Sequence, residues 1–531
     1  MRIENALIRA LAVTVVLLLF VSVPAWADKT AATGSVIVYD DIVGMTHSTD
    51  YTLTVDSIPI TVEAFQDVHI ARFAFSGSVD IAITVDDPII DFNISPHSLS
   101  LTGTATANQL TFTLTEPSKL IVTINDGDKL FLFADPPESS PPTLCSPDVI
   151  NIMDYDVDAT GTVNEQAKIQ QALNDVAALS NGGVLYFPSG TYKTGTLIVG
   201  SNTHIYLESG ALIQGSYWES GTYTDKLPLS GGQQTTVSGL LSIIEEAHVT
   251  ISGRGIIDAD GKNHRAASVG GGRLIFAVQS EHIHIEDIMI RDSISWNTHV
   301  YHSDHISIEN VKVVNSPDNL TTDGIDIDNS RDVMVDRVFV YTGDDSVVIK
   351  SGRWYILPRI PNRDVYNVTV QNSVLWSKAA GGMKVGTETE ATSMQGIRFE
   401  NNDIIYADIP LGLFVHDGTT LSDVTVIDTR VEEINPVQFY SHSKRQMFYF
   451  QIRKRSENSP AGIIRDIYIE NFQSANYGTG NAYFMGFDNT HRVSDITFKD
   501  LTIEGIPRTS LIDARINTNA FVDNVVFLVS D

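Results

Sequence analysis

The stretch from Asn315 to Gly352 reads NSPDNLTTDGIDIDNSRDVMVDRVFVYTGDDSVVIKSG, and it decides the fold. It carries Asp323 in TTDG and the adjacent pair Asp344 and Asp345 in GDDS, with alternating apolar residues between the two clusters. Positions 323 and 344 are 21 residues apart, close to one coil of a solenoid of parallel strands. On neighbouring coils the two clusters would lie about one strand spacing apart, ~4.8 Å. Hydrolysis of a glycosidic bond requires paired acids held at a fixed gap.

The same strand pattern recurs through the rest of the chain. Each unit reads apolar-x-apolar, then a polar corner, then a second alternating strand, and successive units start 23 to 43 residues apart. The units start at His248, His282, His305, Asp332, Asn367, Gly396, Asp423, Asp466 and Asp495. A constant strand pattern with variable spacing indicates loops of different length on a regular core. We therefore predict a right-handed parallel β-helix over residues 148–531.

The segment before the repeats has a different pattern. Residues 35–135 contain short alternating strands separated by Gly, Asp, Asn and Pro, which predicts a small β-sandwich acting as an accessory domain. Residues 136–147 are rich in Pro and predict a stiff linker. Thr162 and Glu165 then form a candidate capping box for an amphipathic helix with an apolar face from Ile169 to Leu179. Such a helix would cover the open end of the solenoid.

Composition limits the possible partners. The chain has 531 residues, with 35 Lys and Arg against 65 Asp and Glu, a formal net charge of −30. This charge argues against nucleic acid and against an anionic membrane surface as partners. Cys145 is the only cysteine, so no intrachain disulfide can form. We expect a monomer that needs no cofactor and no metal.

The first 27 residues have the pattern of a secretory signal peptide. Arg2 and Arg9 are followed by an apolar run from Leu11 to Val23, and small residues precede a cleavage position after Ala27. The run is too short to span a bilayer, which needs ~20 residues. We expect a secreted or periplasmic protein after cleavage near Ala27.

Several motifs resemble glycoside hydrolase family 28, the polygalacturonases and their relatives. They are ISGRGIID (251–258), TTDG (321–324), GDDS (343–346) and IKSG (349–352). The resemblance implies a β-helix enzyme that cleaves O-glycosidic bonds with inversion, with Asp344 as general acid and with Asp323 and Asp345 activating water. Three clustered carboxylates repel one another, so at least one keeps a proton near neutral pH. Inversion also predicts roughly 6.5–9.5 Å between acid and base.

The chain departs from the family pattern at positions that concern the substrate. The family's Asn-Thr-Asp is Thr-Thr-Asp here, and its Gly-His-Gly aligns with residues 380–382, which lack the histidine. Its Arg-Ile-Lys, which holds the galacturonate carboxylate, falls at Phe414, Val415 and His416. A uronic acid loses its bidentate cation there, so we expect a substrate other than plain galacturonan. The N-terminal sandwich resembles that of family 49 dextranases and isopullulanases, which act on neutral α-glucans.

Five further residues are candidates for binding the polysaccharide or oligosaccharide substrate: Trp296, His299, Lys350, Lys384 and His416. Trp296 and His299 lie one coil before Asp323, where an aromatic ring can stack on a sugar. The lysines follow the acid motifs and could donate to hydroxyls or tune the acids. Core packing for the aromatic residues and a surface salt bridge for the lysines are the structural alternatives.

Alternative functions remain open at this point. A solvated acidic corner or a calcium site would also cluster three aspartates. A calcium-dependent polysaccharide lyase shares this fold, and a non-catalytic carbohydrate-binding β-helix would show sugar affinity without turnover.

Overall fold

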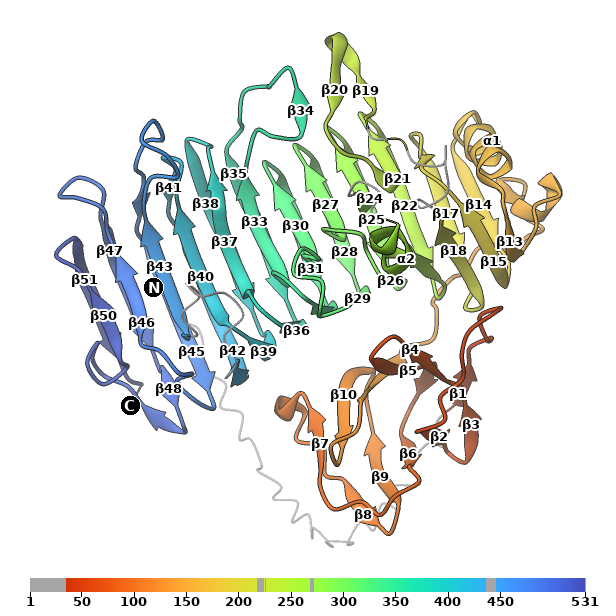
Figure 1. The fold of residues 1–531 in the computed structure, drawn as a ribbon, viewed down its shortest axis with the longest axis horizontal. Helices are drawn as coiled ribbons and strands as arrows, with labels where there is room; N and C mark the ends of the chain where they lie inside the picture. The colour runs from red at the N-terminus through yellow and green to blue at the C-terminus, as the bar shows by residue number, and fades with distance from the viewer. Residues whose placement is uncertain (1–34, 217–223, 225, 268–271, 436–445, 531) are drawn as a thin grey trace, which may run out of the picture.

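The computed structural model describes residues 35–216, 224, 226–267, 272–435 and 446–530. Figure 1 shows a long β-helix with a small sandwich packed against one side, which confirms the predicted fold class. The predicted signal peptide, residues 1–27, lies outside the described residues. Within those residues, no helix has the length and apolar character needed to cross a membrane.

Two sheets form the sandwich, and their facing sides share one apolar core. The six-stranded sheet contains β1 (Ser35–Val38), β4 (Val62–Phe65), β5 (Val68–Ser76), β7 (Phe92–Ser95), β10 (Ser118–Ile124) and β11 (Lys129–Asp135). The five-stranded sheet contains β2 (Thr52–Val55), β3 (Ile58–Ile60), β6 (Val79–Thr84), β8 (Thr104–Thr106) and β9 (Gln109–Leu114). Strand β5 alternates: Ala71, Phe73 and Phe75 enter this core, whereas Val68 and Ile70 face the β-helix.

The β-helix coils have three sides, and one side is a parallel sheet of eleven strands among the described residues. Its strands are β16 (Leu197–Ile198), β21 (Gly239–Ile244), β24 (Arg273–Val278), β27 (Thr298–Tyr301), β30 (Ile325–Asp328), β33 (Val347–Ser351), β37 (Gly381–Thr389), β40 (Ile409–Val415), β43 (Phe448–Ile452), β46 (Ala482–Met485) and β50 (Ile516–Thr518).

The other two sides belong to one folded sheet of 26 strands in the described ranges. Its strands are β12 (Val149–Asn151), β13 (Thr160–Asn164), β14 (Gly183–Phe187), β15 (Gly190–Thr194), β17 (Thr203–Leu207), β18 (Ala211–Gly215), β22 (Ala247–Gly253), β23 (Ile256–Asp258), β25 (Glu281–Glu286), β26 (Met289–Arg291), β28 (Asp304–Glu309), β29 (Lys312–Val314), β31 (Arg331–Asp336), β32 (Phe339–Thr342), β35 (Val365–Gln371), β36 (Val374–Ser377), β38 (Ser393–Glu400), β39 (Asp403–Ala407), β41 (Thr420–Leu421), β42 (Val424–Ile434), β44 (Ile463–Ile464), β45 (Ile467–Ser474), β47 (Val493–Lys499), β48 (Thr502–Ile503), β49 (Ile506–Pro507) and β51 (Val522–Leu528). A separate short sheet joins β19 (Pro228–Leu229), β20 (Gln233–Thr235) and β34 (Ile356–Leu357).

The repeat starts seen in the sequence coincide with one structural column. The nine residues from His248 to Asp495 that begin the units all have positive φ, between 53° and 62°. Gly adopts this left-handed conformation freely, and Asn, Asp and His adopt it more readily than other residues; the nine positions hold only these four types. The start of each unit is therefore marked by residue type, so the repeat could be seen in the sequence although loop lengths vary.

Helix α1 (Gln166–Ala177) covers the first coil, as predicted, but it begins differently. Thr162 lies inside β13, and its hydroxyl donates to Asp158. Glu165 stands at the N-cap position without a side-chain capping bond; its carboxylate instead accepts from the Asp158 backbone N–H. The predicted capping box is therefore wrong, because the side chains of Thr162 and Glu165 both hydrogen-bond to Asp158, in the turn before β13, instead of capping the helix. The buried helix face comprises Ile169, Ala172, Leu173 and Val176. The second helix, α2 (Gly261–Ala266), is short.

The sandwich docks through an aromatic layer and a buried ion cluster. Phe131 on β11 packs edge-on against Phe339 and Tyr341 of β32, with ring centroids 5.1 and 4.8 Å apart. Asp135, at the end of β11, lies 2.6 Å from the Lys312 Nζ and 3.6 Å from the Arg254 guanidinium. Burial disfavours the Asp135 charge, but Lys312 and Arg254 outweigh it and hold its pKa below the usual range.

Candidate active site

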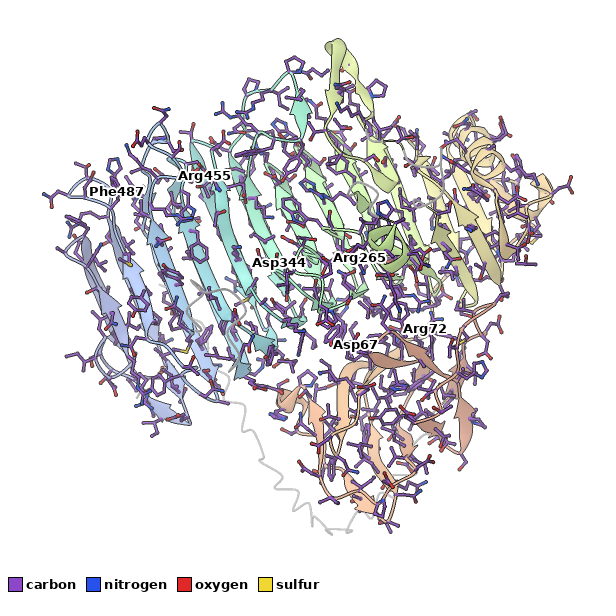
Figure 2. All side chains as sticks on the ribbon, in the orientation of Figure 1. Asp67, Arg72, Arg265, Asp344, Arg455 and Phe487 are labelled. Atoms are coloured by element: carbon purple, nitrogen blue, oxygen red, sulfur yellow. The ribbon has the colours of Figure 1, made fainter. Side chains whose placement is uncertain are left out.

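The three predicted acids meet at the turns before strands β30 and β33. The Gly324 N–H donates to the Asp345 carbonyl at 2.8 Å, so the TTDG and GDDS segments are on successive coils. One carboxylate oxygen of each aspartate lies within 4.8 Å of those of the other two. Asp323 and Asp345 are buried, whereas Asp344 is half-buried. Figure 2 shows Asp344 on the middle coils of the β-helix.

The trio is compact. Its nearest oxygens lie within 4.8 Å of one another. The roughly 6.5–9.5 Å predicted for an acid and base that enclose a water is a separation of whole carboxyl groups rather than of their nearest oxygens. The adjacent positions of Asp344 and Asp345 and the single strand spacing to Asp323 account for the short distances between oxygens.

Two lysines belong to the acid cluster. The Lys350 Nζ on β33 lies 3.1 Å from Asp323 Oδ2 and 2.6 Å from Asp326 Oδ1. The Lys384 Nζ on β37 lies 2.5 Å from Asp345 Oδ2, and the other oxygen of Asp345 accepts the Gly381 N–H at 2.8 Å. Both lysines were predicted to bind substrate or tune the acids, and their contacts are with the acids. Two ammonium groups in this position compete with any metal cation for the same oxygens.

Asp344 differs from its two neighbours. Within the described ranges it forms no ion pair, and its Oδ1 accepts only the Asp345 backbone N–H, at 3.0 Å. Burial raises the pKa of Asp344 well above its usual range, and the Asp323 and Asp345 carboxylates raise it further. Lys384 and Lys350 oppose this rise without cancelling it. Asp344 is therefore the member of the trio that pairs with no cation among the described residues, it is partly open to solvent, and its raised pKa favours the protonated form.

Asp323 has a mixed environment. Burial raises its pKa and Lys350 lowers it, and the net direction is upward. Its Oδ1 is buried and accepts no hydrogen bond from any described residue. Because buried polar atoms normally have partners, this oxygen is a natural acceptor for a proton of water or substrate.

Trp296 and His299 form a wall on the N-terminal side of the acids. The Trp296 ring centroid lies 3.3 Å from the Lys350 Nζ and 4.2 Å from the Arg273 guanidinium carbon. His299 is fully buried behind it, 3.7 Å from Asp328, and burial and Arg273 lower its pKa far below the usual range. Trp296 remains half-buried. Trp296 is therefore positioned to touch a ligand, whereas the neutral His299 ring supports it.

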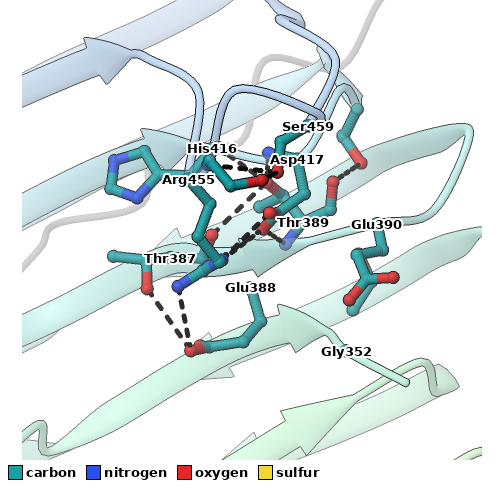
Figure 3. A network of polar contacts seen from close by, with 12 residues as sticks. Gly352, Thr387, Glu388, Thr389, Glu390, His416, Asp417, Arg455 and Ser459 are labelled. Carbon is teal, nitrogen blue, oxygen red and sulfur yellow. Dashed lines mark hydrogen bonds and ion pairs between the residues drawn. The ribbon is translucent and has the colours of Figure 1, made fainter. Parts of the chain in front are cut away.

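His416 lies on the C-terminal side, at the end of β40, and is 1% exposed. Its Nδ1 accepts from the Arg453 Nε at 3.3 Å, and burial and Arg453 lower its pKa to about 3. In Figure 3, Arg455 pairs with Asp417 at 2.9 Å and approaches Glu388 at 3.7 Å. His416 and Arg455 therefore both have side-chain partners in this part of the structure.

The sequence analysis missed Asp326, Asp328 and Arg273. The IDID alternation over residues 325–328 could have predicted the two acids. It places both aspartates on the outer face of the coil, the same face as Lys350. Burial raises the pKa of Asp328 to about 7. Arg273 gave no local signal, because its approach to Trp296 depends on how the coils stack.

Comparisons with known proteins agree with the fold and the motifs. Residues 221–520 match the family model "Glycosyl hydrolases family 28". The chain is 26% identical over 282 residues to a probable polygalacturonase of Vitis vinifera, covering 48% of this chain and 56% of that protein. It is 25% identical over 264 residues to an exo-poly-alpha-D-galacturonosidase of Dickeya chrysanthemi, covering 40% and 43%. The chain spans about half the length of the curated relatives it matches.

Solved structures show the same architecture. An exopolygalacturonase from Thermotoga maritima aligns with a TM-score of 0.52 and 17% identity, over 73% of this chain and 93% of that one. A family 28 exopolygalacturonase from Yersinia enterocolitica aligns with a TM-score of 0.51 and 15% identity, over 85% and 96%. With the family model covering more than half of the sequence, the chain belongs to glycosyl hydrolases family 28.

Proposed function

We propose that this protein is an inverting glycoside hydrolase that cleaves O-glycosidic bonds in a polysaccharide or its oligosaccharides. The observation that carries the proposal is the contrast within the trio. Asp344 pairs with no cation among the described residues and burial raises its pKa, whereas Asp323 and Asp345 each contact a lysine ammonium. One acid and two lysine-paired carboxylates provide a proton donor and a base in one site.

Asp344 donates its proton to the oxygen of the scissile bond as that bond breaks. A water molecule attacks the anomeric carbon from the opposite face and transfers a proton to Asp323 or Asp345. The trio is compact, so the water binds beside Asp323 and Asp345 rather than between acid and base. The unpartnered Oδ1 of Asp323 supports this position.

The anomeric configuration of the first product tests this mechanism. A proton NMR time course on a cleaved oligosaccharide should show the inverted anomer before mutarotation. A retained anomer would contradict the water-activating roles, because it would require one aspartate to act as nucleophile.

We further propose a substrate other than plain galacturonan. Phe414 and His416 stand where the family pattern supplies a cation pair. Of the cations near these positions, Lys384 pairs with Asp345 and Arg455 with Asp417, whereas Arg453 contacts the ring of His416. A uronate carboxylate would have to displace an existing acid to pair with Lys384 or Arg455.

A substrate panel tests this choice. Galacturonan, pectic polymers with alternating neutral sugars, galactans and neutral α-glucans should be compared by release of reducing ends. We expect the highest kcat/KM on a polymer with a neutral sugar at the scissile bond. Fastest turnover of galacturonan would contradict the substrate proposal, and a chelator-sensitive, ultraviolet-absorbing unsaturated product would replace hydrolysis with lyase chemistry.

A further inference from the structure

A second cluster of possible ligand atoms lies in the sandwich, outside the proposed active site. Asp50 precedes β2 of the five-stranded sheet, whereas His69 on β5 and Asp128 just before β11 belong to the six-stranded sheet. One side-chain ligand atom from each lies within 4.8 Å of the other two. The cluster therefore spans the gap between the two sheets at one end of the sandwich.

His69 occupies a position that the strand pattern assigns to the apolar core. It precedes Ala71, Phe73 and Phe75 on the inward face of β5, yet it is an imidazole with 5% exposure. Its Nδ1 is buried and makes no hydrogen bond with any part of the chain that the structure describes. The Nε2 instead points at Asp50, with Oδ2 at 3.3 Å. A buried ring nitrogen without a hydrogen bond is costly unless another partner binds it.

Tyr51 holds this arrangement in place. Its ring packs edge-on against His69 with centroids 5.0 Å apart, and its hydroxyl donates to the Asp128 backbone carbonyl at 2.6 Å. Tyr51 thus fixes the histidine ring and the turn that carries the Asp128 carboxylate. The carboxylates of Asp50 and Asp128 remain exposed at the open side of the cluster.

We propose that Asp50, His69 and Asp128 bind one divalent transition-metal ion of the zinc class. Two ligand atoms at about 2.0–2.1 Å from a tetrahedral ion lie roughly 3.3 Å apart, which matches the 3.3 Å between His69 Nε2 and Asp50 Oδ2. The exposed Asp128 side chain can rotate to complete the set, and water takes the fourth position. An imidazole ligand favours zinc over calcium, which takes six to eight oxygens.

Such an ion would join the two sheets. The sandwich contains no cysteine, since Cys145 lies beyond residue 135, so it has no disulfide to do this. A metal bound only by the folded state stabilises that state in proportion to its occupancy. This site departs from the expectation of a metal-free protein and is independent of the proposed catalysis.

The test is zinc titration of the full-length protein after chelator treatment, followed by calorimetry. We expect one zinc ion per chain and a higher unfolding temperature with zinc. His69→Ala and Asp128→Asn should each weaken zinc binding at least tenfold. Asp128→Asn is isosteric and exposed, and an unchanged circular dichroism spectrum will separate ligand loss from unfolding.

Two control variants address competing zinc sites. His282 is the middle ring of an exposed stack of three histidines, 4.8 Å from each neighbour, and Asp344 belongs to the acid trio. His282→Ala and Asp344→Asn should keep the full stoichiometry. The proposal is overturned if Asp128→Asn and His69→Ala bind zinc like the wild type, if either control removes the binding, or if these ligands hold calcium but not zinc.

Discussion

The acid trio and the ion cluster at the interface between sandwich and β-helix both consist of carboxylates and cations. They differ in how many cations each carboxylate contacts. At the domain interface, one buried carboxylate, Asp135, meets two cations, Lys312 and Arg254. At the trio, three carboxylates share two cations, Lys350 and Lys384. Asp135 therefore contacts two cations, of which Arg254 also pairs with Asp287 at 3.0 Å, whereas Asp344 pairs with no cation among the described residues.

The pKa values follow that balance in opposite directions. Lys312 and Arg254 overcome burial and hold the pKa of Asp135 low, so it stays ionised and fixes the sandwich in place. Burial and two neighbouring carboxylates raise the pKa of Asp344, which favours its protonated form. Burial alone therefore does not set the direction of the shift: two cations outweigh it at Asp135, whereas at Asp344 burial and the neighbouring carboxylates outweigh the more distant lysines.

The largest effect should come from Asp344→Asn. Removing the proton donor should lower kcat by about 10³-fold or more, near the upper range for general acid catalysis. The unfolding temperature should not fall, because the variant replaces a half-buried carboxyl that has no ion-pair partner among the described residues. Kinetics on the preferred polymer provide the measurement, with Asp318→Asn as control because Asp318 is an exposed aspartate outside the trio. Near-normal turnover of Asp344→Asn would reject the assignment.

Asp135→Asn should show the opposite behaviour. It leaves Lys312 and Arg254 without their shared buried carboxylate, so we expect a loss of about 3 kcal/mol or more in the free energy of unfolding. Chemical denaturation measures this, with Asp523→Asn as an exposed control expected to cost under about 1 kcal/mol. Equal stability of both variants would mean that the interface cluster does not hold the sandwich.

The same variant should alter the pH dependence of stability. The folded pKa of Asp135 lies below its unfolded value, so its contribution is complete above about pH 4 and is lost as pH falls through the folded pKa. Asp135→Asn should remove that part of the acid destabilisation. An unchanged acid limb in denaturation curves would contradict the ion-pair explanation.

Lys384→Met should shift activity along the pH axis. Lys384 lowers the pKa of both Asp344 and Asp323, so its removal raises both. Turnover requires protonated Asp344 and ionised Asp323, so both limbs of the kcat profile should move to higher pH, with kcat falling by about tenfold. Lys378→Met offers a control outside the trio. If both limbs of the kcat profile stay at the wild-type pH, Lys384 does not tune the acids and acts only on substrate binding.

Trp296→Leu should have the smallest effect. It removes a half-buried ring that lies against Lys350, and we expect KM to rise by about five- to tenfold with little change in kcat. Trp354→Leu is a control at an exposed ring. A fall in kcat with constant KM would place Trp296 in positioning the acids rather than in binding sugar.

Sequence reasoning succeeded where the signal was local. Alternation and corner residues predicted the coils, and the TTDG and GDDS motifs predicted which acids meet. It failed where side chains from separate coils decide the outcome. Lys350 and Lys384 were visible as residues near the motifs, but their contacts with Asp323 and Asp345 depend on the stacking of β30, β33 and β37. The prediction of a Thr162 capping box was wrong because the Glu165 carboxylate accepts a hydrogen bond from the backbone N–H of Asp158, which lies before β13 and outside the helix.

Infrared difference spectroscopy tests the central claim most directly. Protonated carboxyl groups have their own C=O band, and spectra of the wild type, Asp344→Asn and Asp135→Asn can be compared near neutral pH. We predict that Asp344→Asn loses the signal of one protonated carboxyl and that Asp135→Asn loses none. A full protonated-carboxyl signal in Asp344→Asn would show that Asp344 is ionised and is not the general acid.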